Sequence, residues 1–325
     1  MSVFQIEDRE SRTNPYISIK RLDEKWKNFP RSMLLADYAD KLDLYKNFCV
    51  RRDDIFILGY PRSGTTRLQE LVWIIANDFD FKTQLEYDCD TRIAFFDNPD
   101  WSFKLREKPL AQSFEDMKSP RTMKCHLPVQ LLPDEVWTKK PKLIHIRRDP
   151  KDVATSHYHL ANAFSPNPIK FEDYLEDFLS DGILYTPYRE NVWNYLNLPD
   201  YENILYLTYE EMSADIDGTI IKVAEFLGKT VSMDNAEKIK DYLKFENMKS
   251  RKTNDNKFAH KMWMQPHDPN TKNDLNFIRK GVVGGYKDEM PKDFADRIDN
   301  WYAESGNLNQ GYNFKDQFRA IFKKG

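Results

Sequence analysis

The segment Gly59–Thr66, with the sequence GYPRSGTT, constrains the fold of this chain more than any other. It follows a short apolar run, Asp54–Leu58, which predicts a buried strand that enters a tight turn. After the segment, apolar residues from Leu68 to Ile75 recur at i, i+3, i+4 and i+7, the spacing of a helix packed on a sheet. The sequence therefore predicts a strand, a glycine loop and a helix in direct succession.

Two later segments repeat this order. Leu143–Ile146 predicts a second strand, and the Asp149 and Pro150 that follow are typical of an N-cap and a first helical position. Ile204–Leu207 predicts a third strand, followed by an amphipathic stretch that ends at Gly228. Repeated units of this kind predict an α/β fold with a central parallel sheet flanked by helices. They also predict a ligand site beyond the carboxyl ends of the strands.

The composition is compatible with one large domain. The 325 residues are 40% hydrophobic and 14% aromatic, which is enough for a sizeable core. With 49 Lys and Arg against 52 Asp and Glu, the net charge is −3, which argues against a protein that coats nucleic acid. We expect a single domain over residues 1–325, with a core over about residues 50–290. Residues 1–50 form an N-terminal extension without a clear period, so its structure stays open.

Cysteine usage and hydropathy indicate where such a chain works. Cys49, Cys89 and Cys125 are far apart and lack the spacing of zinc ligands, which favours a reducing compartment. The strongest apolar run, Leu71–Ala76, is too short to span a bilayer. We therefore expect a cytoplasmic protein with no membrane partner.

The glycine loop carries the chemistry of an anion site. Gly64 allows close approach of the backbone, the helix that follows supplies unpaired N–H groups, and Arg62 adds a positive charge. Gly59 and Gly64 have the glycine spacing of a nucleotide-triphosphate P-loop, but the lysine of that pattern is missing. This absence counts against ATP or GTP, and a tight turn without a ligand is the alternative. Three hydroxyls in the loop can donate to an anion: those of Ser63, Thr65 and Thr66.

The loop resembles the 5′-phosphosulfate-binding loop of cytosolic sulfotransferases, usually Tyr-Pro-Lys-Ser-Gly-Thr-Thr-Trp. The resemblance implies that the donor is 3′-phosphoadenosine 5′-phosphosulfate (PAPS) and the product 3′-phosphoadenosine 5′-phosphate (PAP). Arg62 stands where the family usually has lysine, and Arg67 stands where it usually has the tryptophan that stacks on adenine. Arginine keeps the charge and can lie flat on a purine, but it is a poor proton donor.

Two further motifs resemble parts of the same family. Arg148 and Ser156 match the arginine and serine that hold the 3′-phosphate, and Arg279–Gly281 matches the Arg-Lys-Gly signature of the third motif. Taken alone, the first is also compatible with a capped surface helix and the second with a solvated basic pair. The resemblance further implies adenine contacts, although a lone aromatic residue is as often core, at Tyr209, Phe245 and Met248.

The segment Lys124–Pro128 resembles the family's Lys-Thr-His-Leu-Pro, with Cys125 in place of threonine. The resemblance implies that His126 is the general base, a role that suits an imidazole with a pKa near neutrality. It also implies that Lys124 and Arg62 offset charge on the transferring group and on the leaving phosphate. The implied activity is transfer of a sulfuryl group from PAPS without a metal ion. The donor would be bound by Arg62, Ser63, Gly64, Thr65, Thr66, Arg67, Arg148, Ser156, Tyr209, Phe245, Met248, Arg279, Lys280 and Gly281.

The acceptor side is less defined. Residues 87–103 are rich in aromatic side chains, and Phe95 and Phe96 are our candidates, with His126, for contacts to a small apolar acceptor that carries a hydroxyl or amine. Ordinary core aromatics are the alternative. A polar stretch over residues 255–276, which contains Met262–Met264, is a candidate lid. Phenols, steroids, retinoids and amines all remain open as acceptors.

Three other functions compete with this interpretation. A small-molecule kinase with a P-loop would need magnesium and ATP, and a non-catalytic nucleotide-binding module would keep the anion sites without needing His126. A Golgi sulfotransferase would generally carry a membrane anchor. The family's usual dimer signature is absent from Lys287–Asp293, so a homodimer stays an open possibility.

Overall fold

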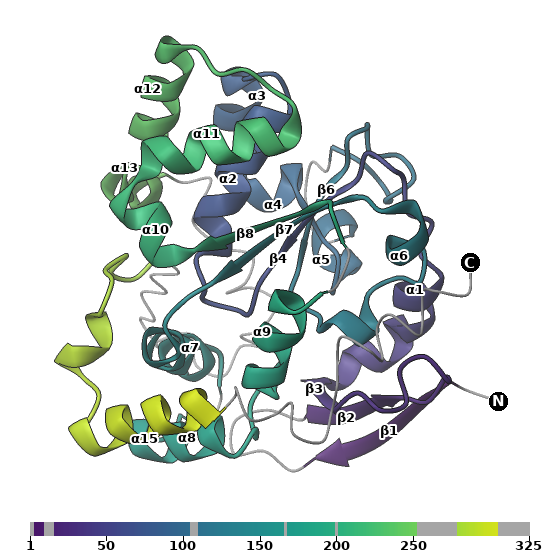
Figure 1. The fold of residues 1–325 in the computed structure, drawn as a ribbon, viewed down its shortest axis with the longest axis vertical. Helices are drawn as coiled ribbons and strands as arrows, with labels where there is room; N and C mark the ends of the chain where they lie inside the picture. Colours follow the sequence, from purple (N-terminus) through teal and green to yellow (C-terminus); the bar gives the residue numbers. More distant parts are fainter. Residues whose placement is uncertain are drawn as a thin grey trace.

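The computed structural model describes residues 3–9, 16–104, 110–165, 168–198, 201–251 and 278–304. Within these residues a five-stranded sheet lies at the centre, in the order β5-β6-β4-β7-β8 (Figure 1). Every neighbouring pair in it is parallel, which confirms the predicted α/β fold. Its strands are β4 (Ile55–Leu58), β5 (Ala94–Phe95), β6 (Thr122–Cys125), β7 (Lys142–Arg147) and β8 (Ile204–Thr208).

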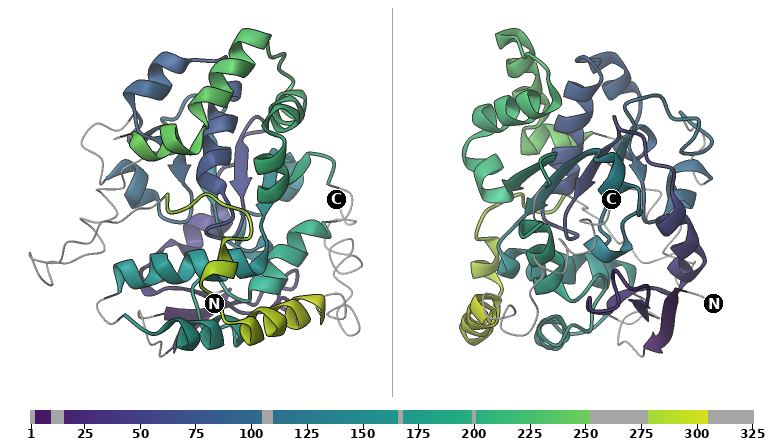
Figure 2. Two further views of the ribbon diagram at one scale, coloured as in Figure 1. Left: turned by 90° about the vertical axis from the view of Figure 1, so that its left-hand side faces the viewer. Right: turned by 45° about the vertical axis from the view of Figure 1, so that its right-hand side comes forward.

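Helices cover both faces of this sheet. In Figures 1 and 2, α2, α10, α11 and α12 lie toward one side, whereas α7, α8, α9 and α15 lie toward the other. The helices are α1 (Leu42–Asn47), α2 (Thr65–Ala76), α3 (Phe81–Glu86), α4 (Cys89–Arg92), α5 (Pro99–Phe103), α6 (Val136–Lys139), α7 (Pro150–Phe164), α8 (Phe171–Leu179), α9 (Tyr188–Leu196), α10 (Tyr209–Ala214), α11 (Ile216–Leu227), α12 (Met233–Tyr242), α13 (Phe245–Ser250) and α15 (Lys292–Ala303). Short 3-10 turns are η1 (Ala36–Lys41), η2 (Val129–Leu131) and η4 (Gly285–Asp288).

The expected helix signals are present in the structure. The carboxylate of Asp149 accepts a hydrogen bond of 2.8 Å from the backbone N–H of Lys151, and Pro150 is the first residue of α7. Gly228 ends α11 with a φ of 71°, a conformation that glycine adopts at little cost. The three predicted strand–helix units are therefore confirmed.

Alternate residues of β4 enter two separate cores. Ile55 and Ile57 pack in a cluster with residues of α2 and α11, whereas Phe56 and Leu58 pack in a cluster with residues of α7 and α9. All four side chains are buried, because a parallel sheet with helices on both faces leaves neither side of a central strand in water.

The residues before β4 form a second sheet. It is antiparallel, in the order β1 (Phe4–Arg9), β2 (Tyr16–Arg21) and β3 (Ser32–Leu35). Arg21 ties it to the rest of the chain, since its guanidinium donates to the Gln130 carbonyl at 3.0 Å and to the Asp134 carboxylate at 2.6 Å. Met33 exchanges backbone hydrogen bonds with Tyr185 and Thr186, which places the end of β3 beside that loop.

Two buried ion pairs hold the elements that carry the candidate site. Arg121 binds the Asp54 carboxylate through two nitrogens, at 2.7 and 2.6 Å, and so joins the starts of β6 and β4. Arg92 pairs with Glu70 at 2.7 Å, and both side chains are fully buried. This second pair fastens α4, just before β5, to α2. Breaking one buried pair of this kind typically costs about 3–5 kcal/mol, because the remaining charge loses its partner.

In the described part of the chain, no helix combines the length and the apolar character needed to cross a membrane.

His145 is a buried titratable group in β7. Its ring stacks on Tyr195 with centroids 4.8 Å apart, and neither ring nitrogen has a hydrogen-bond partner among the described residues. Burial, with a smaller contribution from the charge of Arg147, lowers the pKa of His145 to about 3. The native protein therefore keeps this imidazole neutral at pH values at which the unfolded chain protonates it.

We expect this histidine to make the fold sensitive to acid. Below about pH 6.5 the unfolded state binds one proton that the native state excludes, so stability falls as the pH falls. In His145→Phe this contribution is absent. As the pH falls from 6 to 4, the free energy of unfolding of the variant, relative to that of wild type, should therefore increase by about 1.4 kcal/mol per pH unit. Urea titrations at several pH values test this. A difference that is the same at pH 8 and pH 4.5 would contradict it.

Candidate active site

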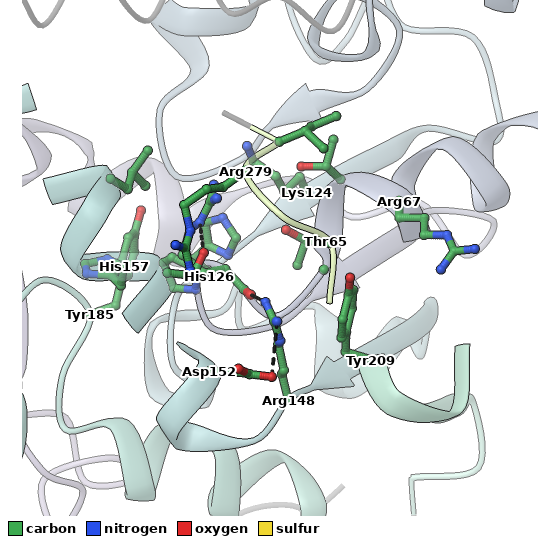
Figure 3. Close-up of a pocket in the computed structure, with 18 of the residues that line it drawn as sticks. Thr65, Arg67, Lys124, His126, Arg148, Asp152, His157, Tyr185, Tyr209 and Arg279 are labelled. Carbon is green, nitrogen blue, oxygen red and sulfur yellow. Dashed lines mark hydrogen bonds and ion pairs between the residues drawn. The ribbon is translucent and has the colours of Figure 1, made fainter. Parts of the chain in front are cut away.

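One cavity, with a volume of about 320 Å³, collects the residues that the sequence analysis singled out (Figure 3). Several of them lie at or shortly after the ends of parallel strands: Arg62 after β4, His126 after β6, Arg148 after β7 and Tyr209 after β8. The cavity thus lies at the carboxyl edge of the sheet, as predicted. Its wall contains Arg62, Gly64, Thr65, Thr66, Arg67, Phe95, Lys124, His126, Arg148, Ser156, Tyr209, Phe245, Met248, Arg279, Lys280 and Gly281.

The first loop is held in a conformation that needs glycine. Gly64 has a φ of +93°, and a Cβ atom there would lie 2.4 Å from Cδ2 of Tyr209. Arg62 also has a positive φ, 72°, and its Nε donates to the Ser156 hydroxyl at 2.9 Å. Ser63 is fully buried and is absent from the cavity wall, and its Oγ has no hydrogen-bond partner among the described residues.

Arg148 joins the glycine loop of residues 59–66 to the loop around Arg279–Gly281. Its guanidinium donates to the backbone carbonyls of Arg62, at 3.3 Å, and Val282, at 2.8 Å. It also lies 4.2 Å from the ring centroid of Tyr209 and 3.2 Å from a carboxylate oxygen of Asp152 (Figure 3). The arginine that the sequence assigned to a phosphate is therefore positioned by four contacts.

Asp152 was not identified from the sequence, although it is a structural centre of the site. Its two carboxylate oxygens accept hydrogen bonds from the backbone N–H groups of Gly284 and Tyr286, at 2.8 and 3.0 Å. It thereby fastens the third motif to α7. Its place four residues after Arg148, in the first turn of α7, is the signal that could have indicated this role.

The third motif carries its own acidic partners. Arg279 donates to Glu289, and Lys280 donates to Glu289 at 2.9 Å and to Asp288 at 3.1 Å. Burial raises the pKa of Glu289, but hydrogen bonds from Arg279, Lys280 and His159 outweigh it and lower this pKa to about 2. An ionised Glu289 therefore holds both cations at the rim of the cavity.

The cationic end of the cavity fits a multiply charged anion. Burial, together with the charges of Arg148 and Arg279, lowers the pKa of Arg62 to about 10. An anion that binds beside Arg62 would neutralise these like charges, which favours its binding. The two glycine loops beside them let backbone N–H groups approach such an anion closely.

Arg67 lies at a different end of the cavity. Figure 3 shows its side chain pointing away from His126 and Arg279. Burial lowers its pKa, and its Nε has no hydrogen-bond partner among the described residues. Phe245 and Met248 line the cavity as well, with Phe245 packed against the backbone of Gly281.

Two hydrogen bonds orient His126. Its backbone N–H donates to the Asp97 carboxylate, at 2.9 Å to the nearer oxygen, and its ring Nδ1 is hydrogen-bonded to the backbone carbonyl of Gly59. Because a carbonyl only accepts, the ring proton lies on Nδ1 and Nε2 keeps its lone pair. Burial, and next the charge of Lys124, lowers the pKa of His126 to about 3. This is well below the near-neutral pKa that we expected from the sequence, and it keeps the imidazole neutral.

The two neighbouring phenylalanines have different surroundings. Phe95 lines the cavity, with its ring 4.1 Å from the Lys124 ammonium and 5.7 Å from the His126 ring. Phe96 instead packs in the buried core against Phe48 and Phe56, with centroids 5.0 and 5.6 Å apart. Phe96 does not line the cavity, so the expected acceptor contact at this residue is wrong. The reason is that successive residues at a strand end point to opposite sides.

The aromatic wall also includes residues that the sequence did not indicate. The hydroxyls of Tyr38 and Tyr185 lie 3.0 Å apart, and a hydrogen bond joins Tyr185 to the buried Asp97. The candidate lid over residues 255–276, with Met262–Met264, lies outside the described residues. Trp101 of the expected aromatic stretch also lines the cavity. Apolar and aromatic residues of the wall that were missed include Tyr16, Leu35, Tyr38, Leu160, Ala161, Leu184 and Tyr185.

Comparison with known proteins now decides the family. Residues 52–310 match the family described as the sulfotransferase domain. The chain belongs to the sulfotransferase family. Luciferin sulfotransferase of Photinus pyralis is 32% identical over 279 residues, which are 80% of this chain and 73% of that protein. Sulfotransferase 1E1 of Homo sapiens is 30% identical over 287 residues, which are 86% of this chain and 93% of that protein.

Solved structures share the fold of this sulfotransferase. Retinol dehydratase in a complex with retinol and PAP has a TM-score of 0.74 and 23% identity, and the match covers 93% of this chain and 96% of that one. Mouse sulfotransferase SULT7A1 complexed with PAP has a TM-score of 0.64 and 24% identity, with 90% and 95% covered. At this identity the likeness shows a common fold.

The glycine loop of the third motif provides a test of the anion site. Gly281 has a φ of +65°, and a Cβ atom there would lie 2.3 Å from Cδ2 of Phe245. Gly284 has a φ of +75°, but the nearest atom to its Cβ position would be Lys287 Cε at 3.9 Å. The two positions therefore share the backbone strain of a substitution and differ in the space available.

We expect Gly281→Ala to weaken PAP binding by more than about tenfold, because the added methyl group displaces either the loop or the Phe245 ring. In Gly284→Ala the affinity should fall less than about threefold, because only the backbone strain applies. Isothermal titration calorimetry with PAP measures both. Equal losses in the two variants would show that contact with Phe245 does not shape the site.

Proposed function

We propose that this sulfotransferase transfers the sulfuryl group of PAPS to the hydroxyl of a small apolar acceptor, with His126 as general base. One observation gives the main support for this proposal. The oriented, neutral imidazole of His126 lies in a single cavity that is cationic at Arg62, Arg148 and Arg279 and aromatic at Phe95 and Tyr185. A base between an anion site and an apolar site is the arrangement that this transfer needs.

The donor would be held at both of its charged ends. Arg148, Ser156 and the loop of Arg279–Gly281 would bind the 3′-phosphate. The first loop, with the N–H groups at the start of α2, would bind the 5′-phosphosulfate. Contact of the adenine with Tyr209, Phe245, Met248 and Arg67 is part of this proposal.

The transfer would follow an in-line course. Nε2 of His126 accepts the proton of the acceptor hydroxyl while the oxygen–sulfur bond forms, and the bond from sulfur to the bridging oxygen of the 5′-phosphate breaks. PAP leaves with the electron pair of that bond. Lys124 and Arg62 offset the charge that develops on the sulfuryl oxygens and on the leaving phosphate, so we propose that no metal ion takes part.

The acceptor would occupy the aromatic end of the cavity. Structures of retinol dehydratase contain retinol in one case and androsterone in another, both of them apolar alcohols. The apolar residues Leu35, Leu160, Ala161 and Leu184 suit an acceptor of this type, whose identity we leave open. A cytoplasmic location stays a prediction, and a homodimer stays an open possibility.

We expect His126→Ala to lower kcat by about 10²- to 10⁴-fold, because the proton of the acceptor loses its base. The Kd for PAP should change less than about twofold, since the imidazole does not contact the bisphosphate in this proposal. His145→Phe is the matched control, because His145 is buried in β7 away from the cavity wall. The assay uses labelled PAPS with a panel of hydroxylated apolar compounds, with and without a chelator. Parallel losses of PAP affinity and turnover would contradict the assignment of the base.

We expect Arg148→Ala to weaken PAP at least tenfold, about the value of one charge-assisted hydrogen bond, and to leave adenosine 5′-phosphate nearly unaffected. The second ligand lacks the 3′-phosphate that Arg148 would bind. Arg147→Ala is the control, since this neighbouring arginine is exposed and absent from the cavity wall. Equal losses for the two nucleotides would mean that Arg148 only supports the loops.

A further inference from the structure

A second imidazole, that of His157, lines the same cavity and has no part in the mechanism above. It lies on α7 and is only 3% exposed. Along the inner face of this helix, Asp152 and Ser156 face the phosphate end of the cavity, and Leu160 and Ala161 line it one turn later. His157 is therefore located where the charged part of the wall changes to the apolar part.

The tautomer of His157 follows from its partner. Its Nδ1 is hydrogen-bonded to the hydroxyl of Tyr174, which is buried. Burial raises the pKa of Tyr174, so this hydroxyl keeps its hydrogen. Among the described residues His157 is the one partner of that hydroxyl, and a buried O–H that donates to nothing is unfavourable. Tyr174 therefore donates to Nδ1, and the ring proton of His157 lies on Nε2.

The two imidazoles of the cavity thus have opposite roles. His126 carries its proton on Nδ1 and offers a lone pair at Nε2, whereas His157 offers an N–H at Nε2. Burial, and then the charge of Arg62, lowers the pKa of His157 to about 3, so it stays a neutral donor. The His157 ring lies 6.0 Å, centroid to centroid, from the ring of Tyr60 in the first loop, so His157 is close to where the transferring group would be.

We propose that Nε2–H of His157 donates a hydrogen bond to a non-bridging oxygen of the sulfuryl group during transfer. This inference rests on the proposed function, since it requires PAPS in the cavity. The neutral donor stabilises charge on the sulfuryl oxygens and, unlike His126, does not compete for the proton of the acceptor. Tyr174, one layer further from the cavity, is a positioning residue that keeps the donor tautomer.

The tautomers can be measured without any ligand. Long-range proton–nitrogen NMR spectra of the full chain with ¹⁵N-labelled histidine distinguish Nδ1–H from Nε2–H rings, and single-histidine variants assign the signals. We expect an Nε2–H ring for His157 and an Nδ1–H ring for His126. An Nδ1–H tautomer at His157 would overturn the proposal, whatever the activity of the protein.

Binding to wild type and variants tests the contact itself. His157→Phe should weaken PAPS by about tenfold or more and leave PAP unchanged, because only PAPS carries the sulfuryl group. His157→Gln, whose amide can donate near the position of Nε2, should recover most of the PAPS affinity. Tyr174→Phe should lower kcat without changing the affinity for PAP, since the tautomer is no longer fixed.

Loss of affinity for both nucleotides in His157→Phe would assign this residue a purely structural role and overturn the proposal. So would unchanged affinity for both, or a lower kcat in His157→Phe that His157→Gln does not restore. A fall of about 10²-fold in kcat, comparable to removal of one oxyanion donor, is the expected size of the effect. If wild type binds PAPS but no acceptor is sulfated, the proposed function fails while the difference between PAPS and PAP still tests His157.

Discussion

The parallel pairing of β4 with β6 and β7 is the constraint on which the site depends. Leu58, the last residue of β4, pairs with Cys125 on one side and with His145 on the other. The residue after each of the first two, Gly59 and His126, is therefore brought to the same edge of the sheet. The hydrogen bond between the Gly59 carbonyl and Nδ1 of His126 is a consequence of this register. A slip of one residue would turn every side chain of β4 to the opposite core and separate the two groups.

Electrostatic repulsion at the cavity is balanced within the fold. Arg62, Arg148 and Arg279 would repel one another, but Asp152 and Glu289 each hold one of the three. These carboxylates also bind backbone N–H groups or further cations, so they fasten the loops and at the same time reduce the net charge. The balance explains how a cationic site can exist before an anion arrives, and why its cations are oriented in advance.

Local signals predicted the strand–helix units, because caps, glycines and apolar periodicity are properties of a few neighbouring residues. The antiparallel sheet of β1, β2 and β3 could not be predicted in this way. Its strands are defined by pairing and by contacts such as Arg21 with Asp134, more than a hundred residues apart. Part of the aromatic wall of the cavity comes from this sheet and the turn after it, so Tyr38 and Tyr185 gave no local signal. Phe95 and Phe96 differ only in which side of the chain they occupy, which an isolated pair of aromatic residues does not reveal.

The replacement of the family's usual lysine by Arg62 has a physical consequence for the first loop. A lysine ammonium is one point of charge, so a bond to Ser156 and a bond to an anion would share a single nitrogen. Arginine distributes its donors over three nitrogens, and here Nε donates to the Ser156 hydroxyl. A guanidinium can therefore hold Ser156 of α7 through one nitrogen without committing all of its donors to that bond. Because a guanidinium gives up its proton with difficulty, the role proposed for Arg62 at the leaving phosphate is stabilisation by charge and not proton donation. In the proposed mechanism, the proton released by the acceptor therefore passes to Nε2 of His126 and not to Arg62.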